Sequence, residues 1–140
     1  MKHSHDHHFV DQLKTKGLKA TELRLAVLEM LSKAQSPMGA DEISQKLKKI
    51  TFDRATLFRT LKTFVDQELI SCVDLGEGHL RYEMNCDFHH HHHHIICSEC
   101  KKIEIVPFCI PNEFKEFLTA RGYHDITHRM DFSGICRNCY

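Results

Sequence analysis

The sequence predicts an α+β chain in which an N-terminal winged helix-turn-helix domain is followed by a small α/β domain. Three observations support this fold class. Apolar residues at helical spacing fill residues 9–67, a β-hairpin pattern occupies residues 69–84, and all 7 cysteines lie beyond residue 70. A chain of 140 residues suits one compact domain or two small ones, and 41% apolar residues can build a core.

Four short helices are expected in the first half, because apolar residues recur there at spacings of three and four. Thr21 and Thr51 have hydroxyl groups suited to capping the second and fourth helices. Gly17 and Pro37 are expected to end the first and second helices. The predicted ranges are 9–16, 21–35, 40–47 and 51–67.

A β-hairpin is expected next, because the strand-like runs 69–75 and 79–84 flank the tight-turn signal Gly76-Glu77-Gly78. Helices followed by such a hairpin are typical of a winged helix-turn-helix. In that fold the last helix enters the major groove of DNA and the hairpin, or wing, lies beside the DNA backbone.

The fourth predicted helix has two distinct faces. Arg59 points almost directly away from its apolar stripe, and Ala55 and Lys62 flank Arg59. Arginine can hydrogen-bond guanine bidentately, whereas lysine mostly contacts phosphate. Residues 10–65 carry a net charge of +5, although the whole chain is neutral, which is compatible with DNA binding; an ordinary solvated face is the alternative. The apolar stripe comprises Leu57, Leu61, Phe64 and Val65.

Two C-x-x-C pairs mark the second half, Cys97/Cys100 and Cys136/Cys139, with 35 residues between them. Each pair can bring two thiolates to one tetrahedral zinc, at Zn–S distances of about 2.3 Å, and two pairs complete a closed structural site. A redox function is the alternative for one such pair alone. Two pairs in one short domain favour zinc.

Six consecutive histidines occupy residues 89–94. A purification tag is the first explanation, but the internal position of the tract argues against it. On a β-strand the even-numbered histidines face one side and the odd-numbered histidines face the other. The tract can therefore supply ligands to two different metal sites.

Cys86 precedes this tract, and a thiolate with two imidazoles and a carboxylate makes a tetrahedral site that suits zinc. Asp74, in the hairpin, is the best candidate for the carboxylate. An idle or buried thiol is the alternative for Cys86. Cys72 is expected in the core, and Cys109 is expected to be buried or idle rather than a ligand.

The rest of the second half is expected to form two strands and a helix, at 101–106, 125–134 and 112–121. His128 and Glu113 could then reach the odd-numbered face of the histidine tract. We expect three parts in the chain: a flexible His-rich tail at 1–8, a DNA-binding domain at 9–84 and a metal-binding domain at 85–140.

No apolar run approaches the roughly 20 residues of a membrane helix, and the N-terminus lacks the apolar stretch of a signal peptide. An odd number of cysteines without a secretion signal argues against a disulfide scaffold and for metal or thiol chemistry. We therefore expect a cytoplasmic protein with no membrane partner.

Five motifs stand out along the chain: Gly17 to Arg24, Ala55-Thr56-Leu57-Phe58-Arg59, Tyr82-Glu83, the histidine tract leading into Cys97-x-x-Cys100, and the terminal Cys136-x-x-Cys139. Through these motifs the sequence resembles the ferric uptake regulator family of metal-dependent repressors over nearly its whole length.

This resemblance implies a homodimer whose C-terminal sheets pair, so that residues 85–140 form a dimerisation domain. It also implies a structural zinc at the four cysteines, a metal-sensing hinge site and a winged-helix DNA reader. Phe58 stands where the family usually has tyrosine. The DNA-contacting residues are predicted to be Arg59, Phe58, Ala55, Lys62, Arg24 and Lys19.

Within the family, the resemblance favours the zinc uptake regulators, which have a cysteine just after the wing, where this chain has Cys86. The implied hinge ligands are Asp74, Cys86, His92 and His94.

Iron and peroxide sensors of the family usually supply a histidine near the start of the third helix. This chain has no histidine between residues 9 and 78. Glu83 and Glu104 are alternative hinge ligands. Because of Glu83, Fe²⁺ or Mn²⁺ is an alternative regulatory metal.

The resemblance also implies a second sensory site on the odd-numbered face of the tract. Its expected ligands are His91, His93 and His128. Pro111 stands where a glutamate is expected, so Glu113 is the nearby substitute.

We therefore expect a zinc-responsive transcriptional repressor of metal uptake genes that binds double-stranded operator DNA as a homodimer. An iron- or peroxide-responsive regulator of the same family is the alternative. No small-molecule substrate or catalysis is expected, because a metal hydrolase would need a catalytic spacing such as H-E-x-x-H, which is absent. A metal-storage protein would not need the basic first half.

Overall fold

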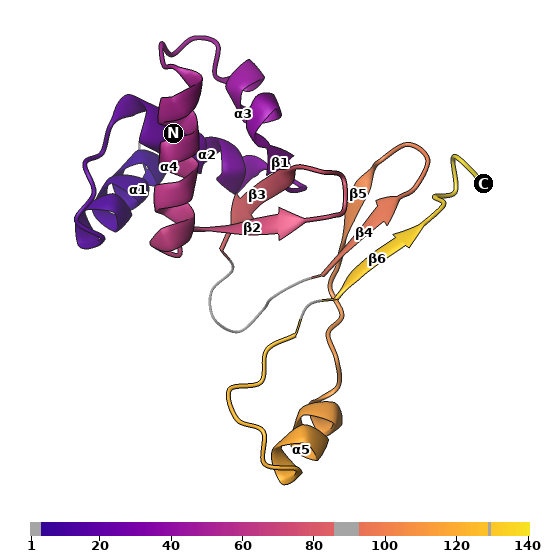
Figure 1. The fold of residues 1–140 in the computed structure, drawn as a ribbon. Coiled ribbons are helices and arrows are strands. Elements are labelled where there is room, and N and C mark those ends of the chain that lie inside the picture. Colours follow the sequence, from indigo (N-terminus) through magenta and orange to yellow (C-terminus); the bar gives the residue numbers. More distant parts are fainter. Residues whose placement is uncertain (1–3, 86–92, 129) are drawn as a thin grey trace. The chain divides into compact units, whose positions relative to one another are not determined.

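The computed structural model describes residues 4–85, 93–128 and 130–140 (Figure 1). Contacts divide the chain into two compact units, Met1–Asn85 and Cys86–Tyr140. Both units combine helices with a three-stranded sheet, so the α+β class is confirmed.

The first unit contains four helices and a sheet in the order β1-β3-β2, with every neighbouring pair antiparallel. β2 and β3 form the predicted hairpin. Gly76 and Gly78 in its turn have φ of +75° and +82°, which glycine adopts without steric cost. Cys72 on β2 was expected in the core, but its side chain is exposed, because it lies on the face of the strand opposite to that of the buried Val73. The elements are α1 (Ser4–Thr15), α2 (Glu22–Lys33), β1 (Met38–Gly39), α3 (Ala40–Lys46), α4 (Arg54–Asp66), β2 (Ile70–Asp74) and β3 (Leu80–Met84).

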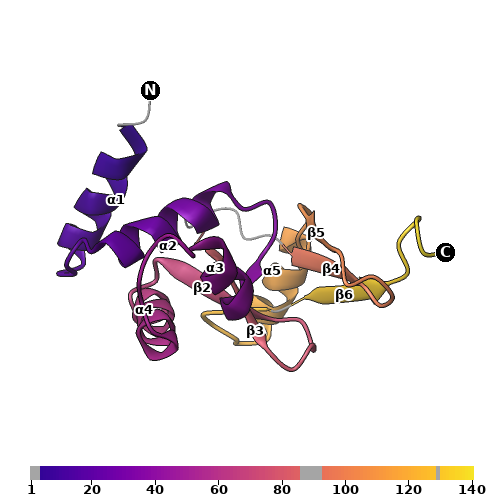
Figure 2. The ribbon, with the colours of Figure 1, turned by 90° about the horizontal axis from the view of Figure 1, so that it is seen from above.

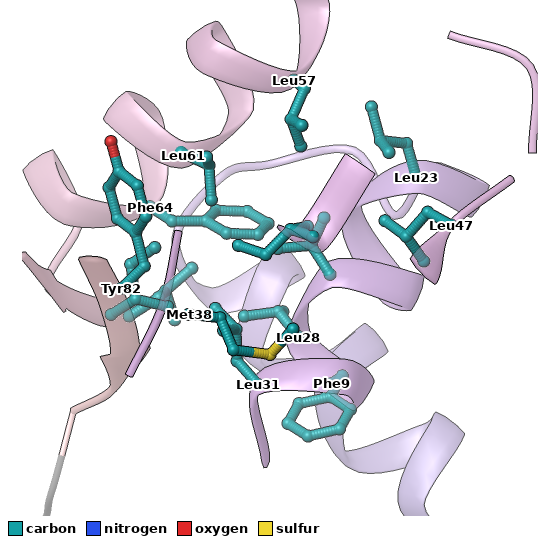
Figure 3. Packing of buried hydrophobic residues seen from close by; sticks show 14 of the residues in the cluster. Phe9, Leu23, Leu28, Leu31, Met38, Leu47, Leu57, Leu61, Phe64 and Tyr82 are labelled. Atoms are coloured by element: carbon teal, nitrogen blue, oxygen red, sulfur yellow. The ribbon is translucent and has the colours of Figure 1, made fainter. Parts of the chain in front are cut away.

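A hydrophobic core joins all four helices of this unit to its sheet (Figure 3). α4 contributes the buried residues Leu57, Thr60, Leu61 and Phe64, which follow the i, i+3, i+4, i+7 pattern of one helix face. Val65 is only half-buried, because it lies at the edge of this stripe. Three of the four residues predicted for the apolar stripe are therefore buried. At the fourth position the buried residue is Thr60 rather than Val65.

Some boundaries in the first unit differ from the prediction. α1 begins at Ser4 rather than Phe9, so it includes most of the predicted tail. Buried Phe9 and Leu13 hold this helix on the core, and no glycine or proline interrupts the turns before them. β1 was not predicted, since a two-residue strand has no readable pattern and exists only through its pairing with β3.

The cap of α4 is Asp53 rather than Thr51. The Asp53 carboxylate accepts a hydrogen bond from the backbone N–H of Thr56 at 2.7 Å. This bond satisfies one of the amide groups that have no partner inside the first turn of a helix. Thr21 caps α2 as predicted, through a hydrogen bond from the Arg24 backbone N–H.

The second unit has a sheet in the order β5-β4-β6, and Figure 2 shows β4 between its two neighbours. β5 is antiparallel to β4, whereas β6 is parallel to it. The last strand is shorter than predicted, because only its final four residues pair with β4. The elements are β4 (His93–Cys97), β5 (Ile103–Val106), α5 (Asn112–Ala120) and β6 (Asp131–Gly134).

Apolar side chains of the second unit are largely exposed in the single chain. α5 buries none of its residues, and Phe114 and Phe117 on this helix are each about half exposed. Within the described part of this unit, Ile96 and Cys97 are the buried apolar side chains. The other exposed large apolar residues here are Ile95, Ile105, Phe108, Tyr123, Phe132, Ile135 and Tyr140.

None of the helices in the described part of the chain has both the length and the apolar character needed to cross a bilayer.

Removing the Asp53 carboxylate should destabilise the first unit. The hydrogen bond from the Thr56 backbone N–H lowers the pKa of Asp53 below its ordinary value of 3.8. A lowered pKa in the folded state means that this stabilisation is complete above the unfolded-state pKa and is lost as the pH falls through the folded-state value. We expect Asp53→Ala to lower the melting temperature at neutral pH, and the difference from wild type to shrink below pH 3.8.

Thermal unfolding followed by circular dichroism at a series of pH values measures this effect. Asp53→Asn is the matched control, because it keeps an acceptor oxygen but cannot ionise. It should retain most of the cap and show no such pH dependence. An Asp53→Ala difference that stays constant with pH would contradict the assignment.

Candidate metal centres and nucleic-acid interface

Four cysteine sulfurs gather at one end of the second sheet. Cys97 ends β4, Cys100 lies in the turn that follows, and Cys136 and Cys139 come after β6. Their sulfur atoms all lie within 4.8 Å of one another. The sequence-predicted zinc ligands are therefore brought together.

The spacing of these sulfurs fits zinc rather than a disulfide. The Cys100 and Cys136 sulfurs are 3.7 Å apart. A disulfide would need about 2.05 Å, whereas four thiolates about 2.3 Å from a tetrahedral zinc lie roughly 3.8 Å apart. None of the cysteines in the described residues forms a disulfide.

Hydrogen bonds make these four thiols unequal. The Cys136 backbone N–H donates to the Cys97 sulfur at 3.3 Å, and this bond, with a second from the Cys100 backbone, lowers the pKa of Cys97 to about 6. Hydrogen bonding to the sulfurs of Cys136 and Cys100 raises the pKa of Cys139 to about 12. Crowded thiols cannot all ionise without a compensating cation. The donor set therefore fits a divalent metal that would bind all four as thiolates.

A second group of ligands lies at the opposite end of β4. His93, His128 and Cys109 place their ligand atoms within 4.8 Å of one another. The Nε2 atom of His128 is 3.2 Å from the His93 Nε2 and 3.2 Å from the Cys109 sulfur. His93 is buried, with 4% of its surface exposed.

This second group differs from the predicted one. Cys109 was expected to be idle, yet it joins the two histidines. The residues around Cys109 form no recognisable metal-binding motif. Only knowledge of the sheet register could have placed this thiol beside the two histidines. Glu113 is outside the group, because it lies in the exposed first turn of α5. His91 lies outside the described residues.

The predicted hinge ligands are only partly described. Cys86 and His92 lie outside the described residues. His94 on β4 is buried, with 3% of its surface exposed. Asp74 ends β2 in the other unit, where its carboxylate accepts a hydrogen bond from the Gly76 backbone N–H at 2.9 Å.

The alternative hinge ligands are two glutamates. Glu83 lies on β3, opposite Ser71 of β2. Glu104 lies on β5, and its carboxylate pairs with the Lys102 ammonium at 2.6 Å. This partner lowers the pKa of Glu104, which keeps the side chain ionised and already engaged with a cation.

The side of α4 turned away from the core carries the predicted DNA-contacting residues Ala55, Phe58, Arg59 and Lys62, all of which are exposed. The Arg59 guanidinium donates to the Thr56 hydroxyl at 3.0 Å. The Lys62 ammonium pairs with Asp66 at 2.8 Å.

Arg59 also lines a surface groove of about 780 Å³ with the other two predicted cations, Lys19 and Arg24. The Arg24 guanidinium donates to the Lys19 carbonyl at 2.9 Å, which fixes its position at the start of α2. Three cations from two segments of the chain, residues 19–24 and α4, thus share one groove, an arrangement that suits a phosphate backbone.

Arg54 is the first residue of α4. Its guanidinium lies over the Phe58 ring at 5.2 Å and pairs with Asp41 at 2.8 Å. This contact was not predicted from the sequence.

An exposed basic helix in one unit and clustered thiol and imidazole ligands in the other define a metal-responsive transcription regulator. The sequence model of the Ferric uptake regulator family matches residues 15–133. The chain belongs to this family, whose members are transcription regulators rather than enzymes.

Known proteins agree with this assignment over most of the chain. It is 34% identical to the Ferric uptake regulation protein of Staphylococcus epidermidis over 131 residues, which are 91% of each chain. It is 30% identical to the peroxide-responsive repressor PerR of Staphylococcus aureus strain Mu50, over 93% of this chain and 88% of that one. The structure of the Helicobacter pylori ferric uptake regulator Fur matches with a TM-score of 0.78 at 25% identity, over 97% of this chain and 91% of that one.

Breaking the four-cysteine group should remove one metal ion per chain and loosen the second unit. The binding free energy of a structural metal site is also folding free energy. We expect Cys100→Ser to reduce zinc content and to speed amide hydrogen exchange in β4, β5 and β6, while α2 and α4 of the first unit keep their protection.

Elemental analysis and hydrogen exchange read by mass spectrometry measure these two effects. Cys72→Ser is the matched control, because it makes the same chemical change in β2 of the other unit. It should alter neither readout. Unchanged zinc content in Cys100→Ser would rule out a metal bound by this group.

Proposed function

We propose that the protein is a zinc-responsive repressor that binds operator DNA as a homodimer in the cytoplasm and controls metal uptake genes. The observation that carries this proposal is the donor chemistry of the metal-binding half. Cys86 lies three residues before the histidine tract, and Cys109 lies against His93 and His128. Thiolate and imidazole together suit zinc better than the harder ions Fe²⁺ and Mn²⁺.

The proposed sensing site has Asp74, Cys86, His92 and His94 as ligands. Zinc at such a site would act as a signal only if it binds the DNA-competent conformation more tightly than the other. A tenfold gain in DNA affinity needs about 1.4 kcal/mol of such coupling. This is a small fraction of the free energy available from four ligands.

An iron- or peroxide-responsive regulator is the second candidate. The names of the relatives favour it, because they are a ferric uptake regulation protein and a peroxide-responsive repressor. Glu83 on β3 would supply the harder oxygen ligand that such a sensor needs.

The homodimer is supported by the second unit. Its apolar side chains are exposed in the single chain, and α5 buries none of its residues. Large apolar side chains exposed in such number on one small unit are typical of a surface that a partner covers. A second copy of the same sheet and helix would cover it symmetrically.

DNA binding is proposed for the exposed side of α4 and the groove beside it. Arg59, with its neighbours Ala55 and Phe58, would reach base edges, and Lys62 would contact phosphate. Lys19 and Arg24 line the adjacent groove, where they would contact the backbone. The hairpin of β2 and β3 would be the wing of this reader.

Arg59→Ala should weaken specific DNA binding by about 1–3 kcal/mol, because it removes a guanidinium placed to contact bases. The measurement is fluorescence anisotropy on a DNA fragment selected from a random pool by the zinc-loaded protein. Lys33→Ala removes the same charge from the end of α2, where Lys33 pairs with Glu29 and lines a different hollow. It should change affinity little. Equal losses in both variants would show that net charge, rather than Arg59 itself, determines binding.

Cys86→Ser should abolish most of the zinc-dependent gain in DNA affinity. The measurement is DNA binding at buffered free concentrations of Zn²⁺, Fe²⁺ and Mn²⁺ without oxygen. Zn²⁺ should activate the wild type at the lowest free concentration, and Cys72→Ser should respond like wild type. Activation by Fe²⁺ or Mn²⁺ below the zinc threshold would favour the second candidate, and a full zinc response in Cys86→Ser would refute the hinge assignment.

A further inference from the structure

Three chain segments converge at the start of β4. β5 runs antiparallel to β4, so that Val106, its last residue, pairs with His93. β6 runs parallel to β4, so that Asp131, its first residue, lies beside the same end of the strand. Cys109 follows three residues after β5 and His128 precedes β6 by three residues. The sheet topology therefore carries all three side chains to one place.

The His128 Nε2 atom has two close neighbours there. It lies 3.2 Å from the His93 Nε2 and 3.2 Å from the Cys109 sulfur. An imidazole nitrogen presents either one N–H or one lone pair in the plane of its ring. This nitrogen can therefore make one well-aligned hydrogen bond, for which the His93 nitrogen and the Cys109 sulfur compete. A cation held among the three atoms would be approached by all three lone pairs at once.

The distances agree with such a cation. Around a tetrahedral zinc, with Zn–N near 2.0–2.1 Å and Zn–S near 2.3 Å, two nitrogens lie roughly 3.3 Å apart and a nitrogen and a sulfur roughly 3.5 Å apart. The two contacts of the His128 Nε2 atom, at 3.2 Å each, are close to these values. The third pair of ligand atoms, from Cys109 and His93, lies within 4.8 Å.

We propose that Cys109 is a metal ligand together with His93 and His128, so that the second metal centre of this chain is a thiolate site. This inference rests on the proposed metal-responsive function and on the second sensory site that the family resemblance implies, and it adds a ligand that the sequence pattern did not predict. The thiol takes the place expected of the Glu113 carboxylate.

A thiolate changes what the site selects. Sulfur favours Zn²⁺ over Fe²⁺ and Mn²⁺, which a carboxylate would accommodate better. Three protein ligands also leave a fourth position for water or another ligand. The Cys109 side is exposed, whereas His93 is buried, so that an ion can enter and leave from the thiol side.

The test uses the full chain with Cys86→Ser, which removes the thiol of the proposed hinge from every sample. Zinc first fills the four-cysteine group, and Co²⁺ is then added, because a thiolate bound to Co²⁺ gives charge-transfer absorption that imidazole and carboxylate do not. We expect Cys86→Ser to show this absorption and the double variant with Cys109→Ala to lose it, together with one bound Co²⁺ per chain.

Two further variants in the same background sharpen the result. Cys109→His should restore Co²⁺ binding without the thiolate absorption, because imidazole is also a good ligand. His128→Gln should weaken Co²⁺ binding as Cys109→Ala does, which keeps the test informative if the alanine variant fails to fold. Cys72→Ser is the matched control and should leave the absorption unchanged.

Persistence of the thiolate absorption after Cys109→Ala would overturn the proposal, and so would its absence from Cys86→Ser itself. Retention of one zinc per chain in the four-cysteine group confirms that each variant is folded. A failed zinc response of DNA binding would leave these results unaffected, because no sample contains the Cys86 thiol and no readout involves DNA.

Discussion

The pairing register of β4 is the constraint on which both metal-ligand groups of the second unit depend. This strand is only five residues long, so its two ends lie about 13 Å apart at the usual rise of a strand. Cys97 at one end meets the cysteines that follow β6, and His93 at the other end meets Cys109 and His128. A slip of one residue would exchange the faces of His93 and His94 and separate both groups. The two groups therefore stabilise the same register from opposite ends.

This double attachment matters because the second unit has little apolar core of its own. Its sheet has three short strands, and its helix buries no residue within the chain. Small units of this kind are usually stabilised by metals, disulfides or association. The pKa of Cys97 is lowered and that of Cys139 is raised, as expected of crowded thiols that a divalent cation would allow to ionise together. In the proposed regulator, a bound metal and a partner subunit would supply the stability that burial does not.

Local signals in the sequence predicted most of the fold. The Thr21 cap, the hairpin turn at Gly76 and the two C-x-x-C pairs each depend on a few neighbouring residues, so their patterns could be interpreted directly. The two residues of β1 depend instead on partners 44 and 42 positions away, and the Cys109 contact depends on a partner 19 positions away. No local pattern contains such a pairing. The Asp53 cap was missed for another reason, since Thr51 two residues earlier offered an equally plausible start.

The two ligand groups differ in a way that would suit one to the proposed structural role and the other to the proposed sensory role. A closed group of four thiolates leaves no open position, and losing its metal costs folding free energy, so it responds poorly to small changes in free metal. A partly exposed group of three ligands can exchange its ion while the strands stay paired. The first unit has its own core, with Leu28, Leu61 and Phe64 fully buried, so its stability need not depend on a metal. In the proposed regulator, metal exchange at the histidine-containing sites can therefore alter DNA affinity only by shifting the balance between folded conformations.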